Sequence, residues 1–333
     1  MMRDSVLIIH EELAPGARAD ELDALVQVRE VAGALQRLGV AAPVQAIGLD
    51  IDRGLEAVRR QRPTCVFNLV ESLGGRGELI GAVPKLLAQA GIPFTGSDGE
   101  TLHVTSHKIA AKRRMMAHGI ATPDWFTAAA RPGDDCCRWI VKSLWEHASF
   151  GLDDTSVVLG RAAARATMAQ RTREFGGLWF AERYLEGREF NVSLLEQGGC
   201  PQVLPLAEMT FAGYAPGKPK IVGYAAKWDE SAIEYRATQR VYPRLAPPLE
   251  QAIRRTALEC WSLFGLHGYT RIDIRLDEQD RPLVLEVNAN PCLSLDAGFA
   301  AAAAEAGLSY ERLIEHILKA ALPQETGLLK HAV

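Results

Sequence analysis

Residues 268–291 read GYTRIDIRLDEQDRPLVLEVNANP, and this stretch decides how the C-terminal half of the chain folds. Apolar and polar residues alternate on either side of a polar turn, which predicts a β-hairpin with two different faces. The apolar face is predicted to join the core and carries Ile272, Ile274, Leu276, Leu283, Leu285 and Val287. The polar face carries Arg271, Asp273, Glu286 and Asn288, so we expect the chemistry there.

Two carboxylates are expected to meet on the polar face of this hairpin. With the turn centred midway along the connecting residues, Asp273 lies directly opposite Glu286, and Arg271 lies opposite Asn288. Side chains paired in this way have Cβ atoms roughly 5 Å apart, so the two like charges repel each other and favour a bound cation. Oxygen ligands from Asp273, Glu286 and Asn288, with open positions beside them, suit Mg²⁺ that also holds substrate phosphates. The alternative is a solvated strand face whose carboxylates pair with Arg271 and Arg275.

The first 97 residues alternate between strand-like and helix-like segments. Strands are predicted at residues 5–9, 44–47 and 65–70, and helices at residues 20–38, 51–60 and 78–90. This alternating order is typical of a parallel α/β unit. A turn rich in glycine and proline at residues 91–96 ends the unit, so a first domain is expected at residues 1–97.

The rest of the chain predicts two further α+β units. Helices are expected at residues 105–118, 162–174, 249–263 and 310–321. Strands are expected at residues 139–142, 157–159, 179–184, 189–195, 270–276 and 283–287. These elements divide into a central unit at residues 98–181 and a C-terminal unit at residues 182–325, which contains the hairpin.

Composition and charge are those of an ordinary globular protein. Of the 333 residues, 48% are hydrophobic and 23% are charged, and the formal net charge of -4 gives no global attraction to nucleic acid or to an anionic membrane. No run of about 18 apolar residues occurs, so a cytoplasmic protein without a membrane or nucleic-acid partner is expected. The six cysteines form no CxxC pair and are expected to be reduced and mostly buried. The adjacent Cys136 and Cys137 could bind a metal or form a strained disulfide, but neither is assigned a role.

The hairpin sequence resembles the C-terminal signature of ATP-grasp ligases, and in particular that of D-alanine:D-alanine ligases. Earlier segments resemble this family in the same order: VFNLVESLGG from residue 66, WIVKSLWEHASFGLD from 139, FAERYLEGREFNVSLL from 180 and GYAAKWDE from 223. The likeness runs from about residue 64 to residue 322. It implies an ATP-grasp fold, with an N-terminal parallel α/β domain and two α+β subdomains that grip ATP, and it implies a homodimer.

The resemblance also implies an ATP- and magnesium-dependent carboxylate-amine ligase that acts on small, amino-acid-like substrates. In such enzymes the carboxylate of the first substrate attacks the γ-phosphate, and the amine of the second substrate displaces phosphate from the resulting acylphosphate. Arg271 matches the arginine that stabilises the anionic states, and Lys227 would reach the transferred phosphoryl group. Two Mg²⁺ or Mn²⁺ ions would be held by Asp273, Glu286 and Asn288.

Residues that contact ATP are also implied by the resemblance. Lys108 and Lys142 would bring ammonium groups to the phosphates, although Lys108 could equally belong to a solvated helix face. Residues 146–151 match a phosphate-covering loop in which Ser149 and Gly151 are retained. The adenine-binding hinge and the ribose contact would be formed by Glu182, Arg183, Tyr184, Leu185 and Glu189. Taken as isolated residues, the two glutamates would be surface charges.

The chain departs from the family pattern at several positions near the expected site. The replaced family residues are a glycine and a serine (here His147 and Ala148), a histidine (Glu71), a tyrosine (Trp228) and a glycine of the oxyanion hole (Cys292). Glu71 is still expected to contact substrate. The acidic residue that binds substrate from the N-terminal segment is not fixed by the sequence, and Glu11, Glu12 and Glu21 are alternatives.

The largest departure lies in CLSLDAGF, which follows Pro291 and should hold the acceptor through Ser294 and Asp296. It lacks the serine-leucine pair that receives the acceptor's carboxylate in D-alanine:D-alanine ligases. Two like charges about 4 Å apart repel by roughly 4 kcal/mol, so Asp296 would exclude a carboxylate unless a cation intervenes. An altered acceptor that carries an amino, guanidino or hydroxyl group is therefore expected. The alternative is that Asp296 caps a helix at residues 297–306.

Three other functions compete with this interpretation. The first is a genuine D-alanine:D-alanine ligase of cell-wall synthesis. The second is an ATP-binding sensor or subunit without turnover, although the retained polar face of the hairpin argues against it. The third is a dinucleotide-dependent oxidoreductase, suggested by the glycines at residues 74–81, whose spacing does not match the dinucleotide-binding motif.

Overall fold

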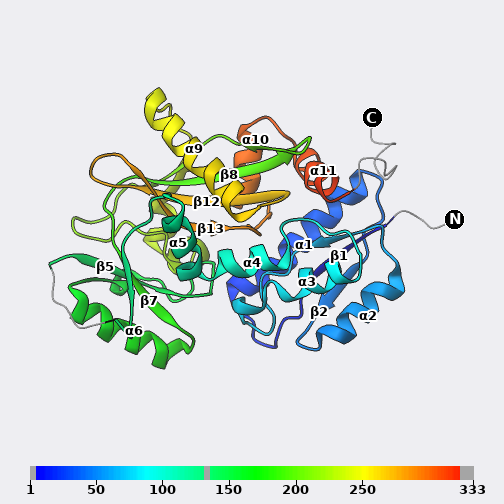
Figure 1. Cartoon of the computed structure of the whole chain (residues 1–333), viewed down its shortest axis with the longest axis horizontal. Helices are drawn as coiled ribbons and strands as arrows, with labels where there is room; N and C mark the ends of the chain where they lie inside the picture. Colours follow the sequence, from blue (N-terminus) through cyan, green and yellow to red (C-terminus); the bar gives the residue numbers. More distant parts are fainter. Residues whose placement is uncertain (1–4, 131–135, 323–333) are drawn as a thin grey trace.

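The computed structural model describes residues 5–130 and 136–322 (Figure 1). Three β-sheets form within these ranges, each with helices packed against it. In Figure 1 the N-terminal unit (blue and cyan) lies at one end of the molecule, the sheet with α6 (green) lies at the other, and the sheet containing the hairpin lies above and between them. In the described ranges, no helix combines the length and the apolar character that crossing a membrane requires.

The N-terminal unit is built on a three-stranded parallel sheet, which confirms the three predicted strands and the first two predicted helices. Strand β1 (Val6–Glu11) lies between β2 (Val44–Ile47) and β3 (Cys65–Asn68). Every residue of β1 is buried, because α1 (Ala19–Arg37) covers one face of the sheet and α2 (Ile51–Gln61) the other. The helix predicted at residues 78–90 is instead a 3₁₀ turn, η1 (Gly77–Leu79), followed by α3 (Ala82–Gln89).

A second helix that the sequence predicted as continuous is also interrupted. Residues 105–118 contain the end of α4 (Gly99–Ser106) and all of α5 (Lys108–Ala117). Between the two helices His107 has an extended backbone, and its Nδ1 accepts a hydrogen bond from the N–H of Ala110 at 3.1 Å. His107 therefore caps α5, and the break leaves Lys108 in the first turn of this helix.

The central unit contains a four-stranded antiparallel sheet in the order β4-β7-β5-β6. Its strands are β4 (Trp125–Thr127), β5 (Arg138–Ser143), β6 (Val157–Leu159) and β7 (Trp179–Arg183). Helix α6 (Arg161–Phe175) packs on one face of this sheet. Strand β4 was not predicted, because three residues are too few to show an alternation.

The third sheet contains the hairpin and runs in the order β11-β10-β8-β12-β13, with β9 added beside β8. Its strands are β8 (Glu189–Gln197), β9 (Cys200–Val203), β10 (Ala207–Phe211), β11 (Thr238–Val241), β12 (Tyr269–Leu276) and β13 (Pro282–Asn288). The associated helices are α7 (Tyr224–Trp228), α8 (Ile233–Ala237), α9 (Pro247–Phe264), α10 (Gly298–Glu305) and α11 (Tyr310–Ala321). The sequence did not predict β9, β10, β11, α7 or α8.

The register of the hairpin is the predicted one at its functional end. Asp273 pairs with Glu286, and Arg271 pairs with Asn288. Beyond these pairs the register shifts at a β-bulge, since Ile274 pairs with residue 284 and residue 285 has no partner on β12. The predicted apolar face is therefore wrong in part. Val284 is fully buried in the core, whereas the predicted core residues Leu283 and Leu285 are partly exposed.

The two ends of the chain share one hydrophobic core. Helix α11 packs against α1, and both contribute to a cluster that also includes β1, β3 and α10. Figure 1 shows α11 (red) beside the N-terminal unit (blue), far from the central sheet. This packing holds the segment after the hairpin, which carries the expected acceptor site, against the N-terminal unit. The division at residues 1–97, 98–181 and 182–325 stays a prediction.

The cysteines differ from the expectation of mostly buried thiols. Cys65 and Cys260 are buried, and this burial raises the pKa of each thiol to about 12. Cys136 and Cys200 are exposed, and Cys137 and Cys292 are partly buried. Cys200 begins strand β9, in which exposed and partly buried residues alternate.

Candidate functional site

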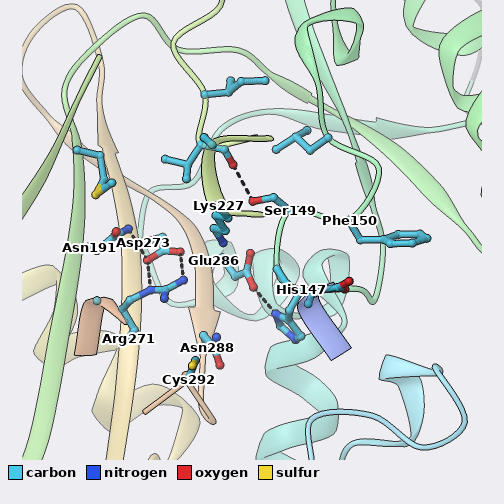
Figure 2. A pocket seen from close by; sticks show the side chains of 18 of the residues that line it. His147, Ser149, Phe150, Asn191, Lys227, Arg271, Asp273, Glu286, Asn288 and Cys292 are labelled. Atoms are coloured by element: carbon cyan, nitrogen blue, oxygen red, sulfur yellow. Dashed lines mark hydrogen bonds and ion pairs between the residues drawn. The ribbon is translucent and has the colours of Figure 1, made fainter. Parts of the chain in front are cut away.

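A cavity of about 530 Å³ lies where the three units meet, and charged side chains from all of them line it. The N-terminal unit contributes Asp20, Asp23 and Glu71, and the central unit contributes Lys108, Lys142, His147 and Ser149. The third sheet and its loops contribute Glu189, Lys227, Arg240, Arg271, Asp273, Glu286, Asn288, Cys292 and Asp296. Figure 2 shows the hairpin side of this cavity.

Asp273 is held by two side chains on its own sheet. Arg271 donates to both carboxylate oxygens, with Nε 2.7 Å from Oδ1 and Nη2 2.9 Å from Oδ2. Asn191 of β8 donates a third hydrogen bond to Oδ1 at 2.8 Å. Burial alone would lower the pKa of Arg271, but the Asp273 carboxylate outweighs this effect and raises it. The pairing of Asp273 with Arg271, which the solvated-face alternative predicted, is thus present. Arg275 pairs with Glu189 instead, at 3.5 Å.

Glu286 faces a histidine from the opposite side of the cavity (Figure 2). Its Oε1 lies 2.5 Å from Nδ1 of His147, and Nε2 of this histidine lies 3.1 Å from the hydroxyl of Ser106. Burial would raise the pKa of Glu286, but the nearby Lys108 and His147 hold it well below its usual value. Glu286 is therefore a carboxylate at neutral pH.

The donor set at the hairpin fits a hard divalent cation. Asp273 and Glu286 are cross-strand neighbours, and Asn288 lies two residue pairs further on, opposite Arg271. Among the described residues no group of three His, Cys, Asp or Glu side chains is arranged to hold a metal. The site would thus offer two carboxylates and one amide, which leaves coordination positions for phosphate oxygens and water, as Mg²⁺ prefers.

Two lysines extend from the central unit into the cavity. Lys108 is 5% exposed, and its Nζ donates to the carbonyl oxygen of Glu146 at 2.7 Å, so the solvated-helix alternative is wrong. Burial lowers its pKa. Lys142 lies on β5, and its Nζ is 2.8 Å from Oε1 of Glu182. Both lysines line the cavity.

The segment proposed as the adenine hinge turns its side chains away from the cavity. Glu182 is 1% exposed and forms ion pairs with Lys142 and with Lys112, a buried lysine that sequence reasoning missed. The hydroxyl of Tyr184 accepts a hydrogen bond from the N–H of Lys220 at 2.8 Å. Residues 182–185 do not line the cavity, so their contribution to a nucleotide site would come from the backbone. Glu189 does line it.

The loop at residues 146–151 is held at its middle by two hydrogen bonds. The hydroxyl of Ser149 donates to the carbonyl oxygen of Val222 at 2.6 Å, and Nε1 of Trp228 donates to that of Ala148 at 3.2 Å. Ala148 and Ser149 adopt φ angles of 55° and 63°, which non-glycine residues rarely do. Lys227 lies in the cavity beside this loop, and burial lowers its pKa, with Arg271 adding to the effect. The loop and Lys227 therefore line the same cavity.

The N-terminal wall is acidic, and it contains the predicted Glu71 but none of the three alternatives for the acidic residue of the N-terminal segment. Among the described residues that line the cavity are Asp20 and Asp23, which lie one turn apart on α1 and were missed. Glu11, Glu12 and Glu21 do not line it. The spacing of three residues, which places two side chains on one helix face, was a signal that could have identified the pair.

Glu71 and Asp23 are each hydrogen-bonded to a neighbour. Oε1 of Glu71 accepts from Nε2 of Gln27 at 3.0 Å, and burial raises the pKa of Glu71. Asp23 accepts from the thiol of Cys292 at 3.0 Å and from the hydroxyl of Ser294 at 3.2 Å. Ser294 is 1% exposed and does not line the cavity, so it supports Asp23 rather than facing a substrate.

Asp296 does not cap the following helix. Helix α10 begins at Gly298, its N-cap is Ala297, and no side chain caps it, so the capping alternative is wrong. Asp296 is exposed at the edge of the cavity. Arg240 of β11 lies next to it, and its Nη2 is 3.5 Å from the carbonyl oxygen of Asp296. A positive charge therefore lies beside Asp296, although its hydrogen bond goes to the backbone carbonyl and not to the carboxylate.

Comparison with known proteins gives a consistent set of relatives. The family model described as D-ala D-ala ligase C-terminus matches residues 139–319. The D-alanine:D-alanine ligase of Ralstonia pickettii is 31% identical over 292 residues, which cover 83% of this chain and 82% of that protein. The corresponding ligase of Cupriavidus metallidurans is 28% identical over 294 residues, 85% of each protein.

Solved structures share the fold. The structure of D-alanine:D-alanine ligase from Bacillus anthracis complexed with ATP superposes with a TM-score of 0.72 and covers 95% of this chain and 97% of its own. Its sequence identity is 19%, so the comparison supports the fold alone. The predicted mixed α/β class and ATP-grasp architecture are confirmed by this match.

Proposed function

Because the chain belongs to the D-alanine:D-alanine ligase family, whose members are ATP-dependent ligases that form amide bonds, we propose that it joins two small amino-acid-like substrates through an altered acceptor site. The observation that carries this proposal is the polar face of the hairpin within the cavity. There Asp273 faces Glu286, and Arg271 lies beside them. A bound divalent cation would offset charge on the transferred phosphoryl group.

Each charged group at the cavity has a proposed part in the reaction. Asp273, Glu286 and Asn288 would hold two Mg²⁺ or Mn²⁺ ions, and Lys108 and Lys142 would bind the phosphates of ATP. Glu189 would accept hydrogen bonds from the ribose, and backbone groups of residues 182–185 would contact adenine. Lys227 and the loop that carries Ser149 would exclude water from the γ-phosphate.

Arg271 would stabilise the negative charge that develops when the acceptor's amine attacks the acylphosphate. Its guanidinium is fixed by two hydrogen bonds to Asp273, so little reorganisation is needed as charge appears. On the other side of the reacting carbon, Asp20, Asp23 and Glu71 form an acidic wall that would attract the ammonium group of the first amino acid. Opposite charges at these two walls would orient a zwitterion.

The altered acceptor site is the finer part of the proposal. The serine-leucine pair that receives an acceptor carboxylate in D-alanine:D-alanine ligases is missing, and Ala297 and Gly298 stand in its place. Asp296 and Arg240 lie around this position instead. The serine of the family is neutral, whereas Asp296 and Arg240 are charged. We therefore expect the protein to use an acceptor other than D-alanine most efficiently.

The second candidate function is D-alanine:D-alanine ligation itself. It is favoured by the names of relatives up to 31% identical to this chain. The ATP-binding sensor without turnover has weaker support, because the cavity also contains Arg271, whose proposed part is to stabilise charge that develops only during the reaction.

An ADP-release screen with Mg²⁺ across pairs of amino acids, amines and hydroxy acids tests these functions. The altered acceptor predicts that a pair other than two D-alanines has the highest kcat/KM. Efficient synthesis of D-alanyl-D-alanine as the best reaction would favour the second candidate. ATP binding without ADP release from any pair would refute a ligase and favour the sensor.

A further inference from the structure

We infer that Arg240 binds an anionic group of the acceptor, so that the acceptor is an amino acid with a free carboxylate rather than a simple amine. This inference rests on the proposed ligase function and names the acceptor's chemical class. Arg240 lies on β11, where it pairs with Met209 of β10, and both residues line the cavity. It therefore reaches the acceptor end from a strand outside the family signature.

The charge of Arg240 is uncompensated, unlike that of the other arginines at the cavity. Arg271 is paired with Asp273, and Arg275 lies 3.5 Å from Glu189. Within the described part of the chain, Arg240 forms no ion pair, and its Nε is buried without a hydrogen-bond partner. Because Arg240 lines the cavity and its charge is not offset there, a ligand carboxylate would gain a charge-assisted hydrogen bond from its guanidinium.

The surroundings of the guanidinium also favour an anion. A β-carbon on Gly298 would lie 3.7 Å from Nη2 and 3.8 Å from Nε of Arg240, so the guanidinium is next to the first turn of α10. This helix has eight residues and no side-chain cap, so its first N–H groups and the positive end of its dipole are also directed at the acceptor end. Planar guanidinium donors match a carboxylate better than they match a neutral hydroxyl or amine.

Asp296 adds selectivity to this arrangement. Its backbone carbonyl accepts the single hydrogen bond of Nη2, at 3.5 Å, while its carboxylate lies at the exposed rim of the cavity. A carboxylate bound between Arg240 and α10 is attracted by two positive groups and repelled by one solvent-screened negative group. A neutral or cationic acceptor gains nothing from Arg240. The cavity therefore orients an amino acid with its carboxylate at Arg240 and its amine toward Arg271.

Arg240→Gln is the test, with Arg236→Gln as the matched control. Arg236 lies on α8, is exposed, donates to the carbonyl oxygen of Ser231 and does not line the cavity. With the best acceptor from the ADP-release screen, Arg240→Gln should raise the acceptor's KM by about 10- to 100-fold, and the KM for ATP should stay constant. Arg236→Gln should change neither constant.

Discrimination between each acceptor and its carboxamide separates recognition from a structural effect. The unmodified protein should prefer the amino acid by at least about tenfold in kcat/KM, and Arg240→Gln should lose that preference. Equal use of acid and amide by the unmodified protein, or a preference that survives in Arg240→Gln, would overturn the inference.

A binding measurement keeps the inference testable if no pair supports ADP release. Calorimetry with Mg²⁺ and a non-hydrolysable ATP analogue would compare D- and L-amino acids with their carboxamides. Binding of an amino acid to the unmodified protein but not to Arg240→Gln would support the carboxylate site even if the proposed ligase function failed. Identical binding of acid and amide, or of neither, would refute it.

Discussion

A buried ion-pair triad at the edge of the site predicts a large loss of stability for Glu182→Gln. The side chains of Glu182 and Lys112 are each 1% exposed, and that of Lys142 is 18% exposed. Glu182 pairs with both lysines, and Lys112 also donates to the hydroxyl of Thr122 at 2.7 Å. The substitution preserves the shape of the side chain but removes the anion that the two ammonium groups share.

Removing one partner of a buried pair costs about 3–5 kcal/mol, because the remaining charge is uncompensated. For a chain of this size that corresponds to a fall in Tm on the order of 10 °C. Burial lowers the pKa of Lys112 even with Glu182 present. Burial would also lower the pKa of Lys142, but Glu182 outweighs this effect and keeps it raised. Without Glu182 both values should fall. A lysine whose pKa is lower in the folded state than in the unfolded chain destabilises the protein more as the pH falls. The difference in the free energy of unfolding between the variant and the parent should therefore narrow from pH 7 to pH 9.

Thermal unfolding followed by tryptophan fluorescence would measure this effect. Glu186→Gln is the matched control, because Glu186 pairs with Arg138 at the surface, is 60% exposed and should contribute under about 1 kcal/mol. Adding Lys112→Met to Glu182→Gln should recover part of the loss, since it removes one unpaired charge. If Glu182→Gln melts within about 2 °C of Glu186→Gln, the triad is not an important source of stability.

Three further predictions address catalysis and pH. Asp273→Asn and Glu286→Gln should each lower the rate of Mg²⁺-dependent ADP release by at least about a hundredfold, and near-normal rates in both would remove the hairpin from the metal site. Arg271→Ala should lower kcat more than it weakens ATP binding, which steady-state kinetics and calorimetry can separate. Burial, with the nearby Glu71, raises the pKa of Glu11 to about 8 from a usual value near 4.5, so the folded state keeps a proton that the unfolded chain has lost. The free energy of unfolding should therefore fall as the pH rises from about 4.5 to about 8. Over this range the Tm of Glu11→Gln should rise relative to that of the parent. A Tm difference that does not change with pH would contradict the raised pKa of Glu11.

The hairpin shows which features of this site can be predicted from sequence. Strict alternation on both sides of one turn fixes the register, so the pairing of Asp273 with Glu286 followed from the residues alone. The β-bulge after this pair did not, because the extra residue has no sequence mark. Leu285 therefore lines the cavity, although the alternation assigned it to the core.

Burial of charge was the second feature that the sequence could not provide. Lys112 and Glu182 read as surface residues on a helix and a strand, and only the packing of α5 against the central sheet brings them together. Lys108 was ambiguous for the same reason. Its neighbours Arg113 and Arg114 are exposed, so a helix with several basic residues turns some of them inward and some outward. Lys108 and Lys112 are four residues apart and share a helix face, but the sequence does not show that this face is the buried one.

Arg240 illustrates the remaining limit, which is tertiary. Strand β11 has four residues, too few for a periodic signal, and it follows two helices of five residues each. The contact with Asp296 depends on β10 and β11 extending the sheet from β8 at its edge, and on α10 packing into the core with the N-terminal unit. Sequence reasoning therefore identified the loss of the serine-leucine pair and the negative charge at Asp296. It could not supply the positive charge of Arg240 beside Asp296, because that contact forms only in the folded chain.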